Sequence, residues 1–257
     1  MTPLEHAARQ ALSLMDLTSL NDDDTETRIA ALCARTATPF GSPAAVCVYP
    51  DFIATADRAL RQAGTREAVK IATVTNFPDG CVNVERASRE TRAAVTAGAD
   101  EIDVVFPYKA LIGGDAEAGR ALVSACRDAC AGRTLKVILE TGELQTPALI
   151  RQAADIALDA GADFLKTSTG KVAVNATLEA AELLLTAIRD SGRDVGFKAA
   201  GGIRTAEDAR AYLDLATDIM GEGWATPAHF RFGASGLLDA LLATLDGRDA
   251  GAVDTPY

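Results

Sequence analysis

The chain alternates between short apolar runs and longer amphipathic stretches. Eight runs rich in Val, Ile, Leu or Phe are bounded by Gly, Pro, Asn or Asp, the residue types that interrupt strands. These runs are LMDLTSL (14–20), AAVCVYP (44–50), VKIATVTNFP (69–78), EIDVVFP (101–107), TLKVILETG (134–142), DFLKTSTG (163–170), DVGFKAAGG (194–202) and HFRFGAS (229–235). Their centres lie roughly 26–34 residues apart, which is the length of a strand, a helix and two loops. The pattern therefore predicts eight successive βα units.

Ala-rich stretches between the apolar runs carry the signals of helices. Three of them place small and apolar residues at helical spacing: ERASRETRAAVTAGAD (85–100), PALIRQAADIALDAGAD (147–163) and TLEAAELLLTAIRDSG (177–192). Pro147 stands near the start of one stretch and Gly161 near its end, as is typical of helix starts and stops. The segment AGAD precedes two of the predicted strands, at 97–100 and 160–163. It predicts a repeated helix-to-strand turn in which glycine ends the helix.

Eight βα units without an interrupting linker predict one α/β domain, a (β/α)8 TIM barrel. The length of 257 residues fits such a barrel directly. We expect a single domain over residues 1–257, with a flexible tail from about residue 246. The alternative is a doubly wound open sheet, but the GxGxxG turn of its dinucleotide-binding form is absent after the first predicted strand.

Composition narrows the classes of function. The chain has 25 Lys and Arg against 36 Asp and Glu, and the resulting net charge of −11 disfavours binding to nucleic acid. Only two histidines are present, His6 and His229, which argues against a His-rich metal site. No apolar run approaches the ~18 residues of a membrane span. The five cysteines are odd in number and form no CxxC, so we expect a reducing, cytoplasmic compartment, with Cys126 and Cys130 in the core.

Two lysines stand near the ends of neighbouring predicted strands. In a TIM barrel the chemistry lies at the carboxyl ends of the strands, where Lys166 and Lys198 would lie side by side. Strand alternation places Gly196 on the face of Lys198, where it leaves room in the layer below. Two adjacent ammonium groups disfavour each other's charge, so one lysine should be a neutral amine able to form a Schiff base. The alternative is that both lysines are solvated or paired structurally.

Aspartates in two apolar strands are candidate partners of these lysines. Asp103, within EIDVVF, could form a salt bridge alone, or could move a proton to or from a substrate hydroxyl through water. Asp16 offers the same choice, with the structural role favoured. Lys136 and Glu140 share a face of the fifth predicted strand; a structural ion pair explains Lys136 at least as well as catalysis, so both residues are left out of the candidate site. Cys47 is expected in the core.

Glycine-bearing turns follow the last three predicted strands and suggest a phosphate site. The turns are Ser168-Thr169-Gly170-Lys171, Ala200-Gly201-Gly202-Ile203-Arg204 and Phe232-Gly233-Ala234-Ser235-Gly236. Glycine lets backbone N–H groups approach an anion, and a helix beginning after Gly236 would add its dipole. Barrels of this kind often bind phosphate in the loops after strands seven and eight. The alternative is that the glycines only permit tight turns.

Motifs along most of the chain, from about residue 14 to 236, resemble one enzyme family. LMDLTSLNDDDT, CVYP, IATVTNFPDG, GADEIDVVFPY, LKVILETGEL, ADFLKTSTGKVAVNAT, VGFKAAGGIRTAEDA and RFGAS occur in this order. They closely resemble the deoxyribose-phosphate aldolases, class I lyases with a TIM-barrel fold, and the KTSTGK segment is the most specific part. The resemblance implies that Lys166 forms the Schiff base, that Lys198 perturbs it and that Asp103 works in proton transfer.

The same resemblance implies a phosphate site and a proton relay. The phosphate residues would be Thr169, Gly170, Lys171, Gly201, Gly202, Gly233, Ser235 and Gly236. Tyr257 matches the family's C-terminal tyrosine, which is linked to proton exchange at the enamine, and Asp16 is the other candidate for a relay. Two positions depart from the family pattern: Ala199 stands where some members have proline, and Gly236 where a second serine is common. The missing hydroxyl at Gly236 could weaken the preference for a phosphorylated substrate.

The resemblance implies a reversible cleavage of 2-deoxy-D-ribose 5-phosphate to D-glyceraldehyde 3-phosphate and acetaldehyde. It implies no metal and no organic cofactor, and as partners only small phosphosugar and aldehyde substrates, with no nucleic acid and no membrane. A homodimer is the expected assembly, although the sequence alone does not decide it. The alternatives are another Schiff-base phosphosugar lyase, a transaldolase-like enzyme, or a phosphosugar-binding barrel without catalysis.

Overall fold

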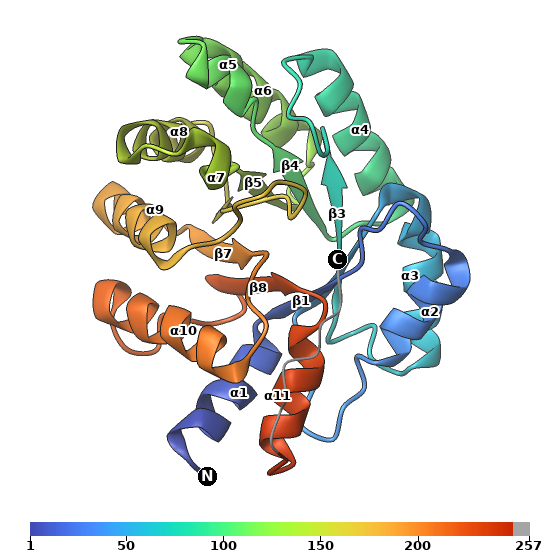
Figure 1. The fold of residues 1–257 in the computed structure, drawn as a ribbon. Coiled ribbons are helices and arrows are strands. Elements are labelled where there is room, and N and C mark those ends of the chain that lie inside the picture. Colours follow the sequence, from blue (N-terminus) through green and yellow to red (C-terminus); the bar gives the residue numbers. More distant parts are fainter. Residues whose placement is uncertain (249–257) are drawn as a thin grey trace.

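The computed structural model describes residues 1–248, which form a closed barrel of eight parallel strands in sequential order (Figure 1). The strands are β1 (Met15–Thr18), β2 (Ala45–Val48), β3 (Lys70–Thr75), β4 (Glu101–Val105), β5 (Thr134–Ile138), β6 (Phe164–Lys166), β7 (Gly196–Ala200) and β8 (Phe230–Ala234). The barrel closes where Asp16 of β1 pairs with Gly233 of β8. This closure confirms the predicted (β/α)8 barrel and excludes the open sheet. The predicted tail lies almost entirely outside the described residues, as does Tyr257.

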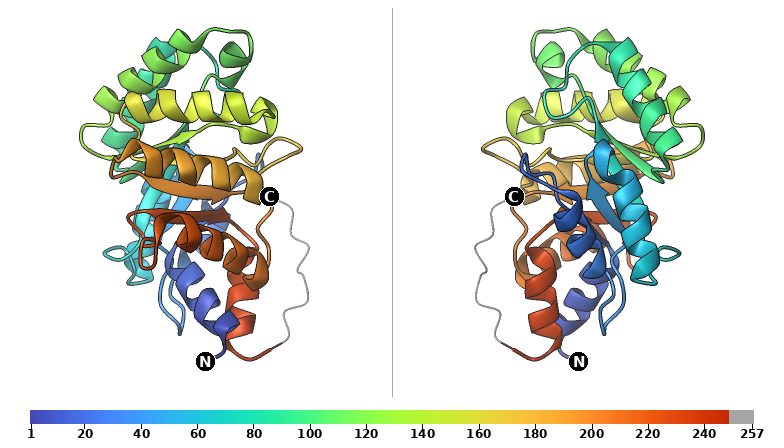
Figure 2. Two further views of the ribbon diagram at one scale, coloured as in Figure 1. Left: turned by 90° about the vertical axis from the view of Figure 1, so that its left-hand side faces the viewer. Right: turned by 90° about the vertical axis from the view of Figure 1, so that its right-hand side faces the viewer.

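Helices surround the barrel on its outer side, as the two side views show (Figure 2). They are α1 (Pro3–Ser13), α2 (Glu26–Ala34), α3 (Ile53–Gln62) with a 3₁₀ turn before it (Pro50–Phe52), α4 (Val84–Ala97), α5 (Tyr108–Ile112), α6 (Ala116–Ala129), α7 (Thr141–Leu144), α8 (Pro147–Asp159), α9 (Leu178–Ser191), α10 (Ala206–Met220) and α11 (Leu237–Leu245). Within residues 1–248, no helix combines the length and the apolar character needed to cross a bilayer.

The predicted helix boundaries follow from local chemistry. Pro147 is the first residue of α8, and the Thr146 side chain caps it by accepting from the Leu149 N–H. The carboxyl end of a different helix, α4, is set by Gly98, which adopts a left-handed conformation with φ +103°. The helix α1 was not predicted; it begins in a capping box of Thr2 and Glu5 and packs against α10 and α11.

The space at Gly196 is filled by the ring of Phe164. A Cβ atom built on Gly196 would lie 2.4 Å from Cε1 of that ring. The same ring lies beneath two buried cations, 6.0 Å from Lys136 Nζ and 5.7 Å from Arg231 Cζ. Phe164 therefore packs against Lys136 and Arg231, two cations of the charged barrel interior.

Replacing Gly196 with alanine should destabilise the barrel by about 1–3 kcal/mol, because the new methyl group overlaps the buried ring of Phe164. The check is the free energy of unfolding in urea. Gly113→Ala is the control, since φ is −75° there and the added Cβ comes no closer than 3.3 Å to another atom. A G196A variant no less stable than G113A would contradict this account of the interior.

Candidate active site

The structure brings Lys166 and Lys198 together at the carboxyl end of the barrel. They are register partners on the neighbouring strands β6 and β7, and both side chains point into the barrel. Asp103 of β4 accepts a hydrogen bond from each of them on the same oxygen, Oδ2, at 2.8 Å. Lys166 is 3% exposed and the other two are fully buried. One carboxylate therefore joins two lysines that the sequence places on different strands.

A second buried carboxylate holds Lys198 from the other side. Lys198 Nζ donates to Asp16 Oδ2 at 2.5 Å, and Arg231 donates to Asp16 Oδ1 at 2.7 Å. Asp16 does not contact Lys166; it acts on the pair through Lys198. Asp16 is thus one of two anions that hold the Lys198 ammonium, and its role as a proton relay stays a prediction.

The suggested ion pair between Lys136 and Glu140 is wrong. Lys136 Nζ lies 2.9 Å from Asp103 Oδ1 and 2.6 Å from Glu101 Oε2, so it belongs to the active-site network. Strand β5 ends at Ile138, and Glu140 has a left-handed backbone with φ +58°, so the alternation of faces stops before it. The Glu140 side chain turns instead toward Thr169.

The network extends one layer further, through Glu101 and Arg231. Arg231 donates to Glu101 at 2.8 Å and to Asp16, while Glu101 also contacts Lys136. Sequence reasoning missed both residues. Each could have been found as a charged residue in an otherwise apolar strand: Glu101 is the first residue of EIDVV, and Arg231 is the second residue of FRFGA. Charged residues are rarely buried without a partner.

Charges within this network balance when Lys166 is neutral. Three carboxylates, of Asp16, Glu101 and Asp103, contact three cations other than Lys166, namely Lys136, Lys198 and Arg231. A proton on Lys166 would add an uncompensated charge to a cluster removed from water, which is costly.

The pKa shifts in the network agree with this balance. Burial lowers the pKa of Lys166, and the Lys198 cation reinforces the effect against the opposing pull of Asp103. Burial also disfavours the Lys198 ammonium, but Asp103 and Asp16 outweigh it and raise the pKa of Lys198 far above its ordinary value. Although burial opposes it, Lys136, Lys166 and Lys198 together hold the pKa of Asp103 well below its usual range. The two shifts have opposite signs: they favour the neutral amine at Lys166 and the ammonium at Lys198.

The predicted phosphate turns gather at the same end of the barrel, but two of their residues are engaged elsewhere. Both donors of Thr169 point to Glu140, the N–H at 3.0 Å and the hydroxyl at 2.5 Å. Gly201 donates its N–H to the Gly233 carbonyl at 3.3 Å. These donor groups are therefore already bonded to acceptors of the protein itself.

Gly233 and Gly236, predicted to belong to one turn, lie in different elements: Gly233 is part of strand β8, and Gly236 is the residue before helix α11. Gly233 lies inside β8, where a Cβ would stand 3.0 Å from Cε of Lys198, so its small size admits the lysine. Gly236 immediately precedes α11 with no side-chain cap, and Ser235 stands beside it. The predicted helix start at this turn is confirmed. Gly170 and Gly202 have φ of +86°, so their turns need glycine.

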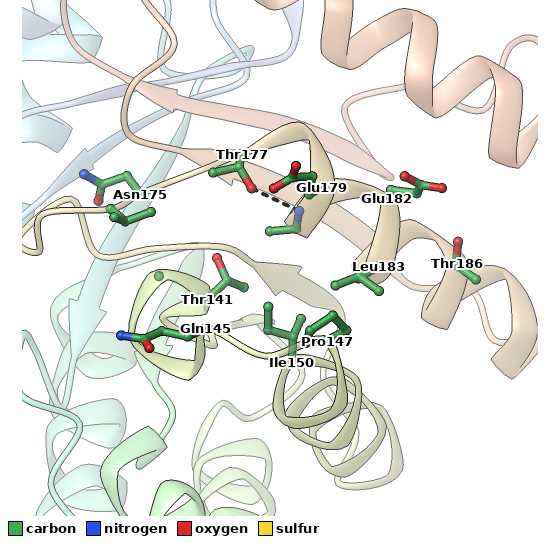
Figure 3. Close-up of a pocket in the computed structure, with 13 residues that line it drawn as sticks. Thr141, Gln145, Pro147, Ile150, Asn175, Thr177, Glu179, Glu182, Leu183 and Thr186 are labelled. Carbon is green, nitrogen blue, oxygen red and sulfur yellow. Dashed lines mark hydrogen bonds between the residues drawn. The ribbon is translucent and has the colours of Figure 1, made fainter.

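A cavity on the outer side of the barrel is not lined by the lysines. It measures about 820 Å³ and lies between α7 and α8 on one side and the start of α9 on the other (Figure 3). Thr141 and Gln145 line one wall, and Asn175 and Thr177 line the other. Cys47, Cys126 and Cys130 are buried, as predicted for core residues.

Comparison with known proteins agrees with this geometry. The family model described as DeoC/LacD family aldolase matches residues 10–243. A candidate deoxyribose-phosphate aldolase from Coccidioides immitis is 32% identical, with a TM-score of 0.79, over 92% of this chain and 86% of that one. A candidate from Toxoplasma gondii is 27% identical, with a TM-score of 0.88, over 96% of each chain. The Aeropyrum pernix deoxyribose phosphate aldolase, described as tetrameric, is 25% identical with a TM-score of 0.74, over 94% and 96%.

Proposed function

Since the chain belongs to the DeoC/LacD family of aldolases, we propose that it cleaves 2-deoxy-D-ribose 5-phosphate reversibly to D-glyceraldehyde 3-phosphate and acetaldehyde. The observation that carries the proposal is Lys166, a buried amine whose pKa is lowered by burial and by its Lys198 neighbour. Such an amine is a nucleophile toward a carbonyl carbon.

Bond formation begins at the Lys166 nitrogen. The neutral amine attacks C1 of the open-chain aldehyde, and the resulting carbinolamine takes up one proton from solvent and loses water, which leaves a protonated Schiff base. This cation replaces the neutral amine in the network, so it adds a positive charge beside Asp103, which lies 2.8 Å from Lys166 Nζ. Asp103 is thereby poised to stabilise the iminium electrostatically.

Cleavage then breaks the C2–C3 bond. The C3 hydroxyl loses its proton, C3 becomes the carbonyl of glyceraldehyde 3-phosphate, and the bonding pair moves into the iminium to form an enamine. Asp103 is a weak base by itself because three lysines lower its pKa, so we assign proton removal to Asp103 acting through a water molecule. Protonation of the enamine at C2 and hydrolysis release acetaldehyde and restore Lys166.

We assign the substrate phosphate to the turns after β6, β7 and β8. Gly170, Gly202 and the Ser235-Gly236 pair offer backbone groups, and α11 begins beside them with its positive dipole end. Lys171 adds a charge; its Nζ lies 3.6 Å from Asp22, and both side chains reach solvent. A few local donors can bind an anion on a protein that is acidic overall.

A panel of substrates tests this function directly. We expect acetaldehyde and glyceraldehyde 3-phosphate to condense, and 2-deoxyribose 5-phosphate to be cleaved with the highest kcat/KM of the panel. Dihydroxyacetone phosphate and a ketose phosphate serve as competing donors. If either of them outcompetes acetaldehyde, the enzyme is a different Schiff-base lyase or transaldolase; binding of phosphosugar without turnover would indicate a barrel that does not catalyse.

Restoring a hydroxyl at Gly236 should strengthen phosphate binding. Gly236 has φ −72° and ψ −18°, which serine adopts without strain, and it directly precedes α11. We expect Gly236→Ser to lower KM for the phosphorylated sugar by about three- to tenfold, the worth of one added hydrogen bond. The kcat/KM for unphosphorylated 2-deoxyribose is the control and should not change. An equal change for both sugars would place Gly236 away from the phosphate.

We also propose that the enzyme is a cytoplasmic homodimer. All five cysteines are unpaired in the structure, which suits a reducing compartment. Size-exclusion chromatography with light scattering measures the mass of the assembly. The mass of a monomer or of a tetramer would contradict the dimer.

A further inference from the structure

Glu140 has an unusual backbone and a buried charge outside the lysine network. It follows β5 with φ +58° and ψ +59°, a conformation that is uncommon for a residue with a side chain. Its side chain is completely buried. A residue held in this way in a sparsely populated region is maintained by its surroundings, and such positions cluster at functional sites.

The Glu140 carboxylate holds the loop between β6 and α9, residues 167–177. Oε1 accepts the Thr169 N–H at 3.0 Å and Oε2 accepts the Thr169 hydroxyl at 2.5 Å. The Thr169 hydroxyl oxygen in turn accepts the N–H of Lys171 at 3.0 Å. Glu140 therefore orders Thr169 directly and Lys171 through it, and Gly170 lies between these two residues. Hydrogen bonds to an ionised acceptor are the stronger kind.

The backbone on either side of Glu140 joins the same segment. Leu139 donates its N–H to the Lys166 carbonyl, and Thr141 donates to the Thr167 carbonyl, both at 2.9 Å. These two bonds fix the end of β6 without any side chain. They would persist if the carboxylate were removed, so the carboxylate acts specifically on the part of the loop beyond Thr167.

A second contact sets how the loop lies against α7. A Cβ on Gly142 would stand 2.0 Å from the Val174 carbonyl oxygen, so the loop backbone rests directly on this glycine. Further along, a Cβ on Gly201 would stand 2.7 Å from Cβ of Asn175, the residue that faces Thr141 across the cavity in Figure 3. The loop is thus packed between α7 and the turn after β7, with the Glu140–Thr169 contact at its start.

We propose that Glu140 is a positioning residue for phosphate recognition, holding residues 169–171 in the shape that presents Gly170 and Lys171 to the substrate phosphate. This inference rests on the proposed function, because it takes a phosphorylated sugar as substrate. Glu140 does not touch the reacting carbons; it acts through Thr169. It therefore affects the preference for a phosphorylated over an unphosphorylated sugar more than it affects the bond-breaking step.

The test is Glu140→Gln with both sugars. Glutamine has nearly the same shape but only one acceptor oxygen and no charge, so one of the two Thr169 donors loses its partner. We expect KM for 2-deoxyribose 5-phosphate to rise roughly tenfold, with kcat and the kcat/KM for 2-deoxyribose each within about twofold of wild type. Glu143→Gln, in the same turn of α7, makes the same chemical change and should alter neither sugar.

Binding of inorganic phosphate, measured by calorimetry, separates this inference from the proposed function. A wild-type enzyme that does not cleave the phosphorylated sugar defeats the proposed function. The Glu140 inference is then decided by binding alone: weaker phosphate binding in E140Q supports it, and unchanged binding overturns it. Equal losses for both sugars also overturn it. Where E140Q fails to fold, Thr169→Val removes the hydroxyl half of the same contact, and an unchanged KM ratio between the sugars is the contradicting result.

Discussion

Replacing Lys166 with leucine should reduce turnover by roughly 10⁴-fold or more while leaving the barrel folded, because the variant loses the only bond-forming group of the proposed mechanism. Leucine fills much of the same space. Asp103 keeps Lys136 and Lys198 as partners at 2.9 and 2.8 Å, so no buried charge is left alone. The measurement is the steady-state rate of 2-deoxyribose 5-phosphate cleavage, with circular dichroism to confirm the fold.

Lys171→Leu is a suitable comparison for this loss. Lys171 follows in the same loop and also carries an amine, but its side chain reaches solvent and pairs only with Asp22 at 3.6 Å. Its removal should raise KM for the phosphorylated sugar and leave kcat largely intact. A K166L enzyme that retains its rate, or a K171L enzyme that loses all of it, would contradict the assignment of the nucleophile.

The second large effect is expected at Lys198. Methionine at this position removes the ammonium whose charge lowers the pKa of Lys166, and it frees Asp103 Oδ2 to pair with Lys166 alone. Both changes raise the pKa of Lys166. Each unit of increase lowers the neutral fraction about tenfold at pH values below that pKa. We expect the rate at pH 7 to fall roughly 10²-fold.

The pH profile of kcat/KM distinguishes this electrostatic role from simple damage. Activity requires neutral Lys166, so it rises as pH rises through the Lys166 pKa, and the raised pKa of K198M moves that limb to more alkaline pH. Loss of structure would lower the whole profile without moving it. Stability is a separate matter, since Asp16 and Asp103 lose a buried partner and the variant should unfold more easily by about 3–5 kcal/mol. An unshifted profile would contradict the role assigned to Lys198.

Much of the upper site could be predicted because strand ends and alternation are local properties. Lys166, Lys198 and Asp103 stand near the carboxyl ends of their strands, and period-two alternation decides which way each points. The order of strands in a barrel then makes Lys166 and Lys198 neighbours without further information. The register confirms it, with Lys166 opposite Lys198.

The lower part of the network could not be predicted in the same way. Glu101 and Arg231 are 130 residues apart and meet across the barrel interior, which depends on the shear of all eight strands and not on any local pattern. Strict alternation along the sequence puts Lys136 and Glu140 on one face, but β5 ends at Ile138, before Glu140. The left-handed backbone at Glu140 turns its side chain away from Lys136, and the residue type at this position does not signal that conformation.

The phosphate turns illustrate an intermediate case. Glycines at 170, 201 and 202 do adopt positive φ, as their positions after strands suggested. The sequence does not say which N–H groups remain available, because Gly201 and Thr169 donate to groups on other segments, the Gly233 carbonyl and the Glu140 carboxylate. Membership of the motif therefore does not show whether a residue's N–H group is available to a ligand.

Reductive trapping tests the central claim, that Lys166 is the neutral amine which forms the Schiff base. The enzyme is incubated with acetaldehyde at pH 7, reduced with borohydride, digested and mapped by mass spectrometry. Lys136, Lys166 and Lys198 lie within one network, so each is a fair alternative site. We predict one ethyl adduct, on Lys166, because the other two are held as cations by carboxylates. An adduct on Lys198 or Lys136 with Lys166 unmodified would contradict the account.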